Sequence, residues 1–347
     1  MRILVYDVAA ENGGAVTVLN WFYGIHKEDK ENQYVYLLGK HTLENTDNIT
    51  VINVPEVKKT WLHRLWFDYI GVKKYLCDYK IEQILSLQNT DIPFCKLPQT
   101  VYIHNALPFS EHRFSIDEDK KLWIYQNLIG SMIKQSIKRA NIVIVQTNWM
   151  KNEVVRQTGI SETKVQVVFP EINLFEDVIW LPADKCTFFY PASDARFKNH
   201  DVILEASKLL YQKGITQFRC VFTLKGNENS RISRIQEEAV DCGMDFLWVG
   251  QQNREQMSDW FAQSILLFPS YLETVGLPIC EAMSVGAPVL LSDCLYARDV
   301  AKEYANARYF VKDNAAALAQ LMEVCIVKRQ DNGCLLYTSP SPRDRTR

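Results

Sequence analysis

Short apolar runs rich in β-branched and aromatic residues alternate with longer amphipathic segments along almost the whole chain. A first series of these runs occupies residues 3–6, 33–38, 49–52, 83–86, 100–103, 142–145 and 165–168. A second series occupies residues 188–190, 218–223, 246–249, 265–268, 289–292 and 307–310. Such alternation is typical of successive βα units in a mostly parallel sheet. The two series therefore predict two Rossmann-like α/β domains, each built on a doubly wound sheet.

The length of the chain also favours two domains. With 347 residues, of which 47% are hydrophobic and 23% charged, the chain can bury a large core. We expect one domain over residues 1–171, a linker over residues 172–183, and a second domain over residues 184–330. In open α/β sheets, ligands bind outside the carboxyl ends of the strands. Two such domains facing each other would bring these ends to one central cleft, where we expect the chemistry.

The last residues differ in character from the rest of the chain. Residues 334–347 read CLLYTSPSPRDRTR, which resembles a translated sequencing adapter. Such segments are excluded from fold reasoning. We expect that the native C-terminus is missing and that the second domain is truncated.

Charge and cysteine usage exclude several classes of protein. A formal net charge of −2 gives no reason to expect nucleic acid as a partner. No apolar run approaches the roughly 20 residues that span a bilayer, and the first residues predict a strand rather than a signal peptide, so we expect a cytoplasmic protein. The nine cysteines form no Cys-x-x-Cys pair, which favours buried free thiols such as Cys186, Cys220 and Cys280 over disulfides or a metal site.

A loop and a short helix are specified locally between residues 270 and 288. Pro278 suits the first position of a helix, and Gly286 suits the left-handed position that ends one. We expect free backbone N–H groups near Gly276, Leu277 and Ile279, where a helix N-terminus can bind a diphosphate.

Two glutamates flank this loop and the first turn of its helix. The Glu281 carboxylate can accept two hydrogen bonds from a vicinal diol, such as the 2′- and 3′-hydroxyls of a ribose. Glu273 can reach past a diphosphate toward a sugar. The alternative is that both are ordinary acids at a helix start, an effect of about 0.3–1 kcal/mol each.

Residues 273–283, ETVGLPICEAM, followed by Gly-Ala-Pro-Val at 286–289, resemble the E-x7-E signature of retaining glycosyltransferases of family 4, which have the two-domain GT-B fold. The resemblance implies that Glu281 binds the nucleotide ribose and that Glu273 contacts the donor sugar. Thr274, Gly276 and Leu277 between them are further candidates for contact with the donor. The resemblance further implies transfer with retention of anomeric configuration.

Residues 191–200, PASDARFKNH, resemble the family segment in which an arginine and the lysine of a Lys-Asn pair hold the diphosphate. Lys198 matches that lysine. The usual arginine position is occupied by Ser193, and Arg196 is the candidate replacement. The alternative for Lys198 is a solvated surface lysine.

Two further candidates lie in the first domain. Gly13 and Gly14 follow the first strand and resemble the Gly-Gly loop that family members place against the donor phosphates and the acceptor. A bare Gly-Gly pair also occurs in ordinary turns. His104 follows a strand, where the family often has a cleft-lining histidine near the donor sugar, although a structural role is the alternative.

The triplet Asp117-Glu118-Asp119 spells the D-x-D of metal-dependent transferases of another fold. It lies in a strongly charged stretch that is typical of a helix start rather than at a strand end. We therefore expect no metal site.

Residues 58–74 interleave basic and aromatic side chains, a composition suited to a membrane surface. The alternative, which we favour, is an amphipathic helix that covers the sheet and keeps its lysines in water.

Together these features predict a metal-independent glycosyltransferase that moves a sugar from a nucleoside-diphosphate sugar to a glycan or lipid-linked acceptor, in cell-surface polysaccharide synthesis. Glu273, His104 and Lys198 are the expected catalytic residues. A nucleotide-sugar epimerase of the same fold and a non-catalytic or truncated nucleotide-sugar-binding protein are the alternatives.

Overall fold

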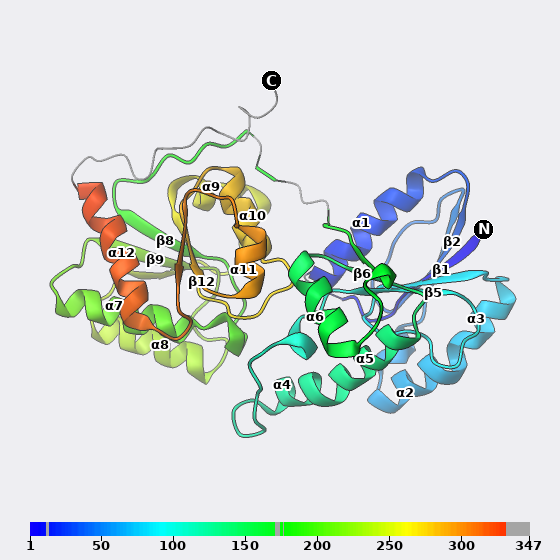
Figure 1. Ribbon diagram of the computed structural model, residues 1–347. Helices are drawn as coiled ribbons and strands as arrows, with labels where there is room; N and C mark the ends of the chain where they lie inside the picture. The colour runs from blue at the N-terminus through cyan, green and yellow to red at the C-terminus, as the bar shows by residue number, and fades with distance from the viewer. Residues whose placement is uncertain (12–13, 171–173, 176, 331–347) are drawn as a thin grey trace. The chain divides into compact units, whose positions relative to one another are not determined.

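The computed structural model describes residues 1–347 except 12–13, 171–173, 176 and 331–347 (Figure 1). The chain divides into two compact units, Met1–Glu171 and Ile172–Arg347. We call them the N-terminal unit and the C-terminal unit, and describe each by itself.

The N-terminal unit is built on a seven-stranded sheet in which every strand pair is parallel. Its strands are β1 (Arg2–Asp7), β2 (Gln33–Leu38), β3 (Ile49–Asn53), β4 (Gln83–Ser86), β5 (Gln99–Ile103), β6 (Ile142–Val145) and β7 (Val165–Val167). Their order across the sheet is β3-β2-β1-β4-β5-β6-β7.

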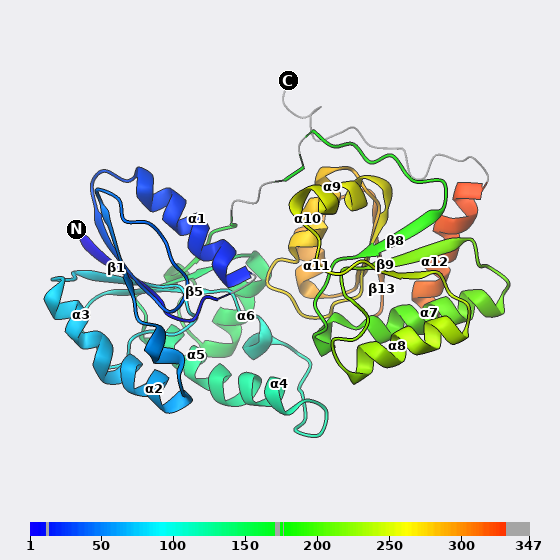
Figure 2. The ribbon, with the colours of Figure 1, turned by 180° about the vertical axis from the view of Figure 1, so that it is seen from behind.

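Helices cover both faces of this sheet (Figures 1 and 2). They are α1 (Gly14–Glu28), α2 (Trp61–Trp66), α3 (Val72–Asp78), α4 (Lys120–Ile124), α5 (Gly130–Arg139) and α6 (Asn148–Thr158). A π-helical segment, Phe67–Gly71, joins α2 to α3, and a second one, Tyr125–Ile129, joins α4 to α5.

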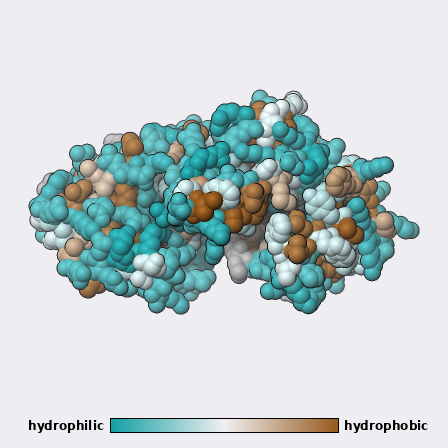
Figure 3. Space-filling model, turned by 90° about the horizontal axis from the view of Figure 1, so that it is seen from below, coloured by the Kyte–Doolittle hydropathy of each residue, from teal (hydrophilic) through white to brown (hydrophobic). Residues whose placement is uncertain are grey.

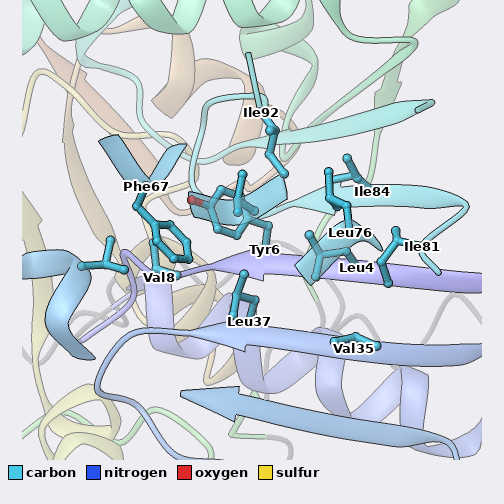
Figure 4. Packing of buried hydrophobic residues seen from close by; sticks show 12 residues of the cluster. Leu4, Tyr6, Val8, Val35, Leu37, Phe67, Leu76, Ile81, Ile84 and Ile92 are labelled. Carbon is cyan, nitrogen blue, oxygen red and sulfur yellow. The ribbon is translucent and has the colours of Figure 1, made fainter. Parts of the chain in front are cut away.

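The core of the N-terminal unit follows from the alternation of side chains along each strand. In β1, Leu4 and Tyr6 pack toward α2 and α3, against residues such as Phe67 and Leu76 (Figure 4). The intervening Val5 packs on the opposite face, toward α1. A parallel strand covered on both faces is apolar at nearly every position, which is why β1 has no polar face.

The C-terminal unit repeats this plan with a six-stranded sheet, again with every pair parallel. Its strands are β8 (Cys186–Tyr190), β9 (Phe218–Phe222), β10 (Phe246–Trp248), β11 (Ile265–Phe268), β12 (Val289–Ser292) and β13 (Ala307–Phe310). Its helices are α7 (His200–Gln212), α8 (Ser230–Asp241), α9 (Arg254–Gln263), α10 (Leu277–Ser284), α11 (Leu295–Val300) and α12 (Ala315–Gln330). Helices α7, α8 and α12 lie on one face, and α9, α10 and α11 on the other (Figures 1 and 2).

The order of strands in this second sheet is β10-β9-β8-β11-β12-β13. Counted within the unit, this is the 3-2-1-4-5-6 order of a doubly wound fold, and the first six strands of the N-terminal unit follow the same order. The prediction of two Rossmann-like, doubly wound α/β domains is therefore confirmed. In such sheets the order in which successive strands are added reverses at a switch point, which here lies between β1 and β4 in one unit and between β8 and β11 in the other.

The described part of the segment expected to be a linker is attached to the C-terminal unit. The Trp180 backbone N–H donates to the Val285 carbonyl oxygen (2.7 Å), and its indole N–H donates to the Ser264 carbonyl oxygen (2.8 Å). The Leu181 N–H donates to the Ala262 carbonyl oxygen (2.7 Å). These bonds hold residues 180–181 against the α9–β11 and α10–β12 connections. None of the helices within the described residues has the length and apolar character needed to cross a membrane.

Candidate functional site

The loop after β8 presents Lys198 at the switch point of the C-terminal unit. Residues Arg196–Lys198 form a 3₁₀ turn, and Asn199 adopts a left-handed conformation (φ 55°) before α7 begins. The hydroxyl of buried Tyr190, the last residue of β8, donates to the Lys198 carbonyl oxygen (2.6 Å). The backbone that carries the lysine is thereby fixed to the end of its strand.

The loop after β11 meets this turn from the neighbouring strand. The Tyr271 N–H donates to the Phe197 carbonyl oxygen (3.0 Å), which joins the two loops through their backbones. Tyr296 donates its hydroxyl hydrogen to the Ser270 carbonyl oxygen from the side of α11. Because β8 and β11 are adjacent in the sheet, their carboxyl ends bring these loops together.

An ion pair between Lys198 and Glu273 forms where these loops meet. The Lys198 ammonium contacts Glu273 Oε1, and the two side chains are only 15% and 16% exposed. The Ser270 hydroxyl donates to the same oxygen (2.7 Å). Charge-assisted hydrogen bonds of this kind are stronger than neutral ones, and low exposure strengthens them further. A cation and a carboxylate are thus held side by side at the switch point.

Gly276 shapes the start of α10. Its backbone is left-handed (φ +76°), and a Cβ there would lie 3.1 Å from Ile279 Cδ1 and 3.4 Å from a Phe268 ring carbon. A residue with a side chain would meet both a conformational penalty and a crowded environment. Glycine is therefore required by the turn itself, whatever lies above it.

One expectation for this turn is wrong. The Ile279 N–H is not free, because it donates to the Gly276 carbonyl oxygen (2.8 Å) in the first turn of the helix. The helix also begins one residue earlier than expected, at Leu277, so that Pro278 is its second residue. The end of the helix is as predicted, with Gly286 left-handed (φ +83°) just after it.

Glu281 lies one turn into α10 and is paired with an arginine from α9. Arg254 Nη1 donates to Glu281 Oε1, and the glutamate side chain is 12% exposed. Burial raises the pKa of the Glu281 carboxyl, and Arg254 opposes that rise. The guanidinium carbon of Arg254 lies 3.7 Å from the centre of the Phe175 ring.

The remaining candidates of the C-terminal unit occupy the rim of the same loops. Thr274 is half-buried in the loop after β11, and Leu277 is the first residue of α10. Arg196 and Ser193 are both exposed in the loop after β8. The structure therefore brings together Lys198 and Glu273, and separately positions Glu281 against Arg254.

In the N-terminal unit, Gly13 lies outside the described residues. Gly14 is the first residue of α1, and a Cβ on it would meet nothing within 4 Å. The next residues, Ala15 and Val16, pack against a buried cluster that includes Leu87 after β4 and Tyr102 on β5. The start of α1 thus lies at the carboxyl end of the sheet.

His104 follows β5 at the same end of the sheet. Its backbone N–H donates to the Asn89 side-chain oxygen (2.8 Å), and its side chain is half-buried. Burial lowers the pKa of His104 to about 4, although a hydrogen bond with the Leu87 backbone opposes this. The imidazole is therefore neutral at physiological pH and can exchange hydrogen bonds but supplies no positive charge.

Two buried polar side chains at the β1–β4 switch point were not anticipated from the sequence. Asp7 ends β1 at 2% exposure, and its Oδ2 has no hydrogen-bond partner among the described residues. Burial raises the pKa of this carboxyl to about 6, although the backbone N–H groups of Ala10 and Ala9 lower it. Gln88, just after β4, is 7% exposed, with neither side-chain amide atom bonded within the described part of the chain.

The D-x-D triplet is a helix start, as the sequence indicates. Asp119 is the N-cap of α4, and its carboxylate accepts hydrogen bonds from the Lys121 and Leu122 N–H groups (3.0 Å each). Among the described residues, no group of three or more His, Cys, Asp or Glu side chains could hold a metal ion.

Ser270 and Arg254 are the other two site residues that sequence reasoning missed. Ser270 stands at a strand end beside the recognised motif, so its position gave a usable signal. Arg254 is 27 residues from Glu281 and belongs to no recognised motif. Only the packing of α9 beside α10 reveals this contact.

Residues 175–330 match the family described as Glycosyl transferases group 1. The D-inositol 3-phosphate glycosyltransferase of Streptomyces scabiei is 30% identical over 178 residues, which is 45% of this chain and 39% of that protein. An N,N'-diacetylbacillosaminyl-diphospho-undecaprenol alpha-1,3-N-acetylgalactosaminyltransferase of Campylobacter jejuni is 26% identical over 190 residues, 52% of this chain and 50% of that protein. These matches span half or less of the curated relatives.

The fold is also that of solved glycosyltransferase structures. Anabaena HepE, solved in complex with UDP-glucose, superposes with a TM-score of 0.67 at 14% sequence identity, and the match covers 95% of this chain and 91% of that one. At this identity the likeness establishes the architecture. The chain has the GT-B fold, and residues 175–330 in its C-terminal unit match the family Glycosyl transferases group 1.

Proposed function

We propose that this protein is a glycosyltransferase that moves a sugar from a nucleoside-diphosphate sugar to a glycan or lipid-linked acceptor. The observation that carries the proposal is the Lys198–Glu273 pair, 15% and 16% exposed, at the β8–β11 switch point. Ligands bind at such points in doubly wound sheets. Both residues also lie within the segment that matches the glycosyl transferase family.

The donor is assigned to the C-terminal unit. Lys198 and the N-terminus of α10 at Gly276 and Leu277 would hold the diphosphate, since a helix N-terminus and an ammonium group both attract anions. Glu273 would contact the donor sugar, and Glu281 the ribose hydroxyls. Thr274 and Arg196 would line the rim. The UDP-glucose bound to Anabaena HepE makes a uridine diphosphate sugar the first donor to test.

The proposed reaction needs stabilisation of the leaving group. As the bond between the anomeric carbon and the diphosphate oxygen breaks, negative charge grows on the phosphates and the sugar becomes oxocarbenium-like. Lys198 and the α10 dipole would offset that charge without a metal, in the way that fixed dipoles stabilise oxyanions. The acceptor hydroxyl then gives its proton to the departing diphosphate, and its oxygen bonds to the anomeric carbon on the face that the diphosphate leaves, which gives retention.

The acceptor is assigned to the N-terminal unit. His104, neutral because burial lowers its pKa to about 4, could exchange hydrogen bonds with sugar hydroxyls, and Gly13 and Gly14 would leave room beside them. The unpaired Oδ2 of Asp7 and amide of Gln88 add polar groups at the same end of the sheet. The Campylobacter relative, whose name includes a diphospho-undecaprenol substrate, supports a lipid-linked glycan as the acceptor. A lipid-linked acceptor would suit cell-surface polysaccharide synthesis.

An apolar surface is exposed on α2 and on the π-helical segment that follows it. This surface supports peripheral binding of the protein to the cytoplasmic face of a membrane. Its residues are Trp61 (65% exposed), Leu62 (72%), Trp66 (57%), Tyr69 (38%) and Ile70 (57%). The opposite side of the same segment is buried through Phe67 and Val72. The segment thus covers the sheet, as favoured, but its outer face is more apolar than a solvated helix requires. We call these five residues the α2 apolar surface.

Basic residues continue from this surface along α3, where Lys73 and Lys74 are both exposed. Apolar and aromatic residues next to lysines suit the boundary of a bilayer that contains anionic lipids. Figure 3 shows hydrophobic residues interrupting an otherwise hydrophilic surface on the N-terminal unit. Peripheral binding would place the enzyme where a lipid-linked acceptor is found.

The proposal is tested by incubating the full chain with UDP-glucose and other nucleoside-diphosphate sugars, selected by thermal shift. Release of the nucleoside diphosphate is then measured with and without lipid-linked and free glycan acceptors. We expect release that depends on an acceptor, with the sugar recovered on that acceptor. Conversion of the donor to its epimer without an acceptor and without net release of the diphosphate would favour an epimerase. Donor binding without turnover on any acceptor would favour a non-catalytic binding protein.

A further inference from the structure

Arg254 is fixed at the start of α9 by contacts on two sides. Its guanidinium stacks on the Phe175 ring, with the guanidinium carbon 3.7 Å from the ring centre, and its Nη1 donates to Glu281 Oε1. The Asn253 side chain caps the helix through the Gln256 N–H (2.9 Å), which holds the backbone of Arg254 in place.

The ring beneath the guanidinium is itself immobilised. Phe175 is 7% exposed and packs against Phe261 of α9, with ring centres 5.7 Å apart. Its backbone N–H donates to the Ser284 hydroxyl oxygen at the end of α10 (3.3 Å). The stack therefore rests on both helices that carry the ion pair.

The location of this arginine is unfavourable for the helix alone. A cation in the first turn of a helix opposes the positive end of the helix dipole. Its positive charge is instead matched by Glu281, whose carboxylate is 12% exposed. Because the dipole of α9 disfavours a cation at this position, we expect the function of Arg254 to lie in its contact with Glu281.

The contact leaves part of each partner available. Arg254 engages only Oε1 of Glu281, and within the described residues no hydrogen bond reaches Oε2. The Arg254 side chain is 48% exposed even though Phe175 covers one face of its guanidinium. A planar guanidinium stacks on flat π systems on either face.

We propose that Arg254 belongs to the nucleoside-binding part of the donor site, where it orients the Glu281 carboxylate for a ribose hydroxyl and offers its other face to the nucleobase. This inference rests on the proposed function. Arg254 acts on the ribose through Glu281 and is in that respect a positioning residue. Its contact with the base would be direct.

Two substitutions separate these roles. Arg254→Ala removes both the ion pair and the flat face. Arg254→Lys keeps a cation for Glu281 but has no planar group to stack, since the two side chains differ in this respect. Arg219→Ala is the matched control, because Arg219 also pairs with a carboxylate, that of Asp245 (3.0 Å), but at the amino-terminal edge of the same sheet.

Binding is measured by calorimetry on the full chain. Wild type is first titrated with UDP, GDP and ADP, and the diphosphate that binds is then compared with its 2′-deoxy analogue and with inorganic pyrophosphate. Arg254→Ala should lower the affinity for the nucleoside diphosphate by about tenfold or more, which is the loss expected for a charged hydrogen bond and a stacking contact. The affinity for pyrophosphate should stay within about twofold of the wild-type value, because pyrophosphate has no nucleoside.

The deoxy analogue isolates the action through Glu281. Wild type should prefer the ribose form by about tenfold, Arg254→Lys should keep that preference, and Arg254→Ala should lose most of it. If Arg254 had only a structural role, Arg254→Ala would lower the affinity for all ligands alike and would lower the melting temperature. Equal affinity of wild type and Arg254→Ala for the nucleoside diphosphate, or tighter binding by the variant, would overturn the inference and leave the proposed function standing. Failure of wild type to bind any of the three diphosphates would overturn both.

Discussion

Lys198 and Glu273 are 75 positions apart in the chain and form an ion pair at the switch point between β8 and β11. Each comes from the loop after its own strand, and a backbone hydrogen bond from Tyr271 to Phe197 (3.0 Å) locks the two loops together. The pair depends on strand order, because only neighbouring strands bring such loops into contact.

Replacement of Lys198 tests the assigned role in leaving-group stabilisation. We expect Lys198→Ala to lower kcat by about 10²–10³, the loss seen when one oxyanion donor is removed. The measurement is acceptor-dependent release of the nucleoside diphosphate. Lys213→Ala is the control, since Lys213 follows the far end of α7 and pairs with Glu323 (2.6 Å). Near-normal turnover in Lys198→Ala would show that the lysine has another role.

Replacement of Glu281 tests the assignment of the ribose site. Glu281→Gln keeps the size of the side chain but removes its charge, so a hydrogen bond to a charged acceptor worth about 1.5–3 kcal/mol should be weakened. We expect affinity for the nucleoside diphosphate to fall by about tenfold or more, with pyrophosphate binding little changed. An equal loss for both ligands would place Glu281 at the phosphates or in the fold instead.

The two left-handed glycines that flank α10 form a natural pair of test sites. Gly286→Ala should cost about 1–2 kcal/mol of unfolding free energy, from backbone conformation alone, because a Cβ there meets nothing within 4 Å. Gly276→Ala should cost more, since its Cβ would lie 3.1 Å from Ile279 Cδ1. Urea unfolding gives both values. Only Gly276→Ala should also weaken donor binding. Equal losses of stability in the two variants would show that the side chains around Gly276 move to make room for the added Cβ.

Asp7 should give the N-terminal unit a distinctive pH dependence. Burial raises its pKa from 3.8 to about 6, so the folded state holds this proton more tightly than the unfolded state does. Between these two values the unfolding free energy therefore falls as pH rises, by about 3 kcal/mol in total. The asparagine in Asp7→Asn cannot ionise. The unfolding free energy of this variant, compared with that of wild type at the same pH, should therefore be higher above pH 6 than below pH 4.

The comparison with Asp7→Asn is needed because His26 acts in the opposite direction. Burial lowers its pKa from 6.5 to about 4, so its contribution to stability is lost as pH falls through that range. His26 is present in both proteins, so the difference between their unfolding curves isolates Asp7. A difference that does not change with pH would mean that Asp7 titrates normally.

The α2 apolar surface predicts binding to bilayers that contain anionic lipids. Leu62→Ser should reduce sedimentation with vesicles of phosphatidylglycerol and phosphatidylcholine, because a residue 72% exposed loses its apolar contact with the bilayer. Val240→Ser is the control, since Val240 is 70% exposed on α8 of the other unit. Binding that is equal in wild type and Leu62→Ser would argue against this surface.

The sequence predicts the fold well because each element is specified locally. The apolar runs at residues 33–38, 83–86, 142–145, 265–268 and 289–292 coincide with β2, β4, β6, β11 and β12. Buried parallel strands are continuous runs of hydrophobic residues bounded by polar loops, so their ends can be located in the sequence. Gly286 likewise marks the end of α10 through a conformation that other residues avoid.

The contacts of the site are less predictable. The pairing of Glu281 with Arg254 depends on how α9 packs beside α10, and no spacing in the sequence encodes it. The burial of Asp7 depends on helices that cover both faces of β1. The outward face of residues 61–70 also departs from a simple amphipathic pattern. The π-helical turn at Phe67–Gly71 changes the angle between successive side chains there, so Tyr69 and Ile70 emerge on the exposed side.

The shielding of Lys198 by Glu273 has a consequence for how ligands arrive. The two residues together contribute no net charge, so a diphosphate that binds Lys198 as proposed would have to displace the Glu273 carboxylate from it. Long-range attraction then adds little to the rate of association, and the rate should respond weakly to ionic strength. Small anions such as orthophosphate, which offer few other contacts, should therefore compete poorly, and the pair would favour ligands that also bind elsewhere on the unit.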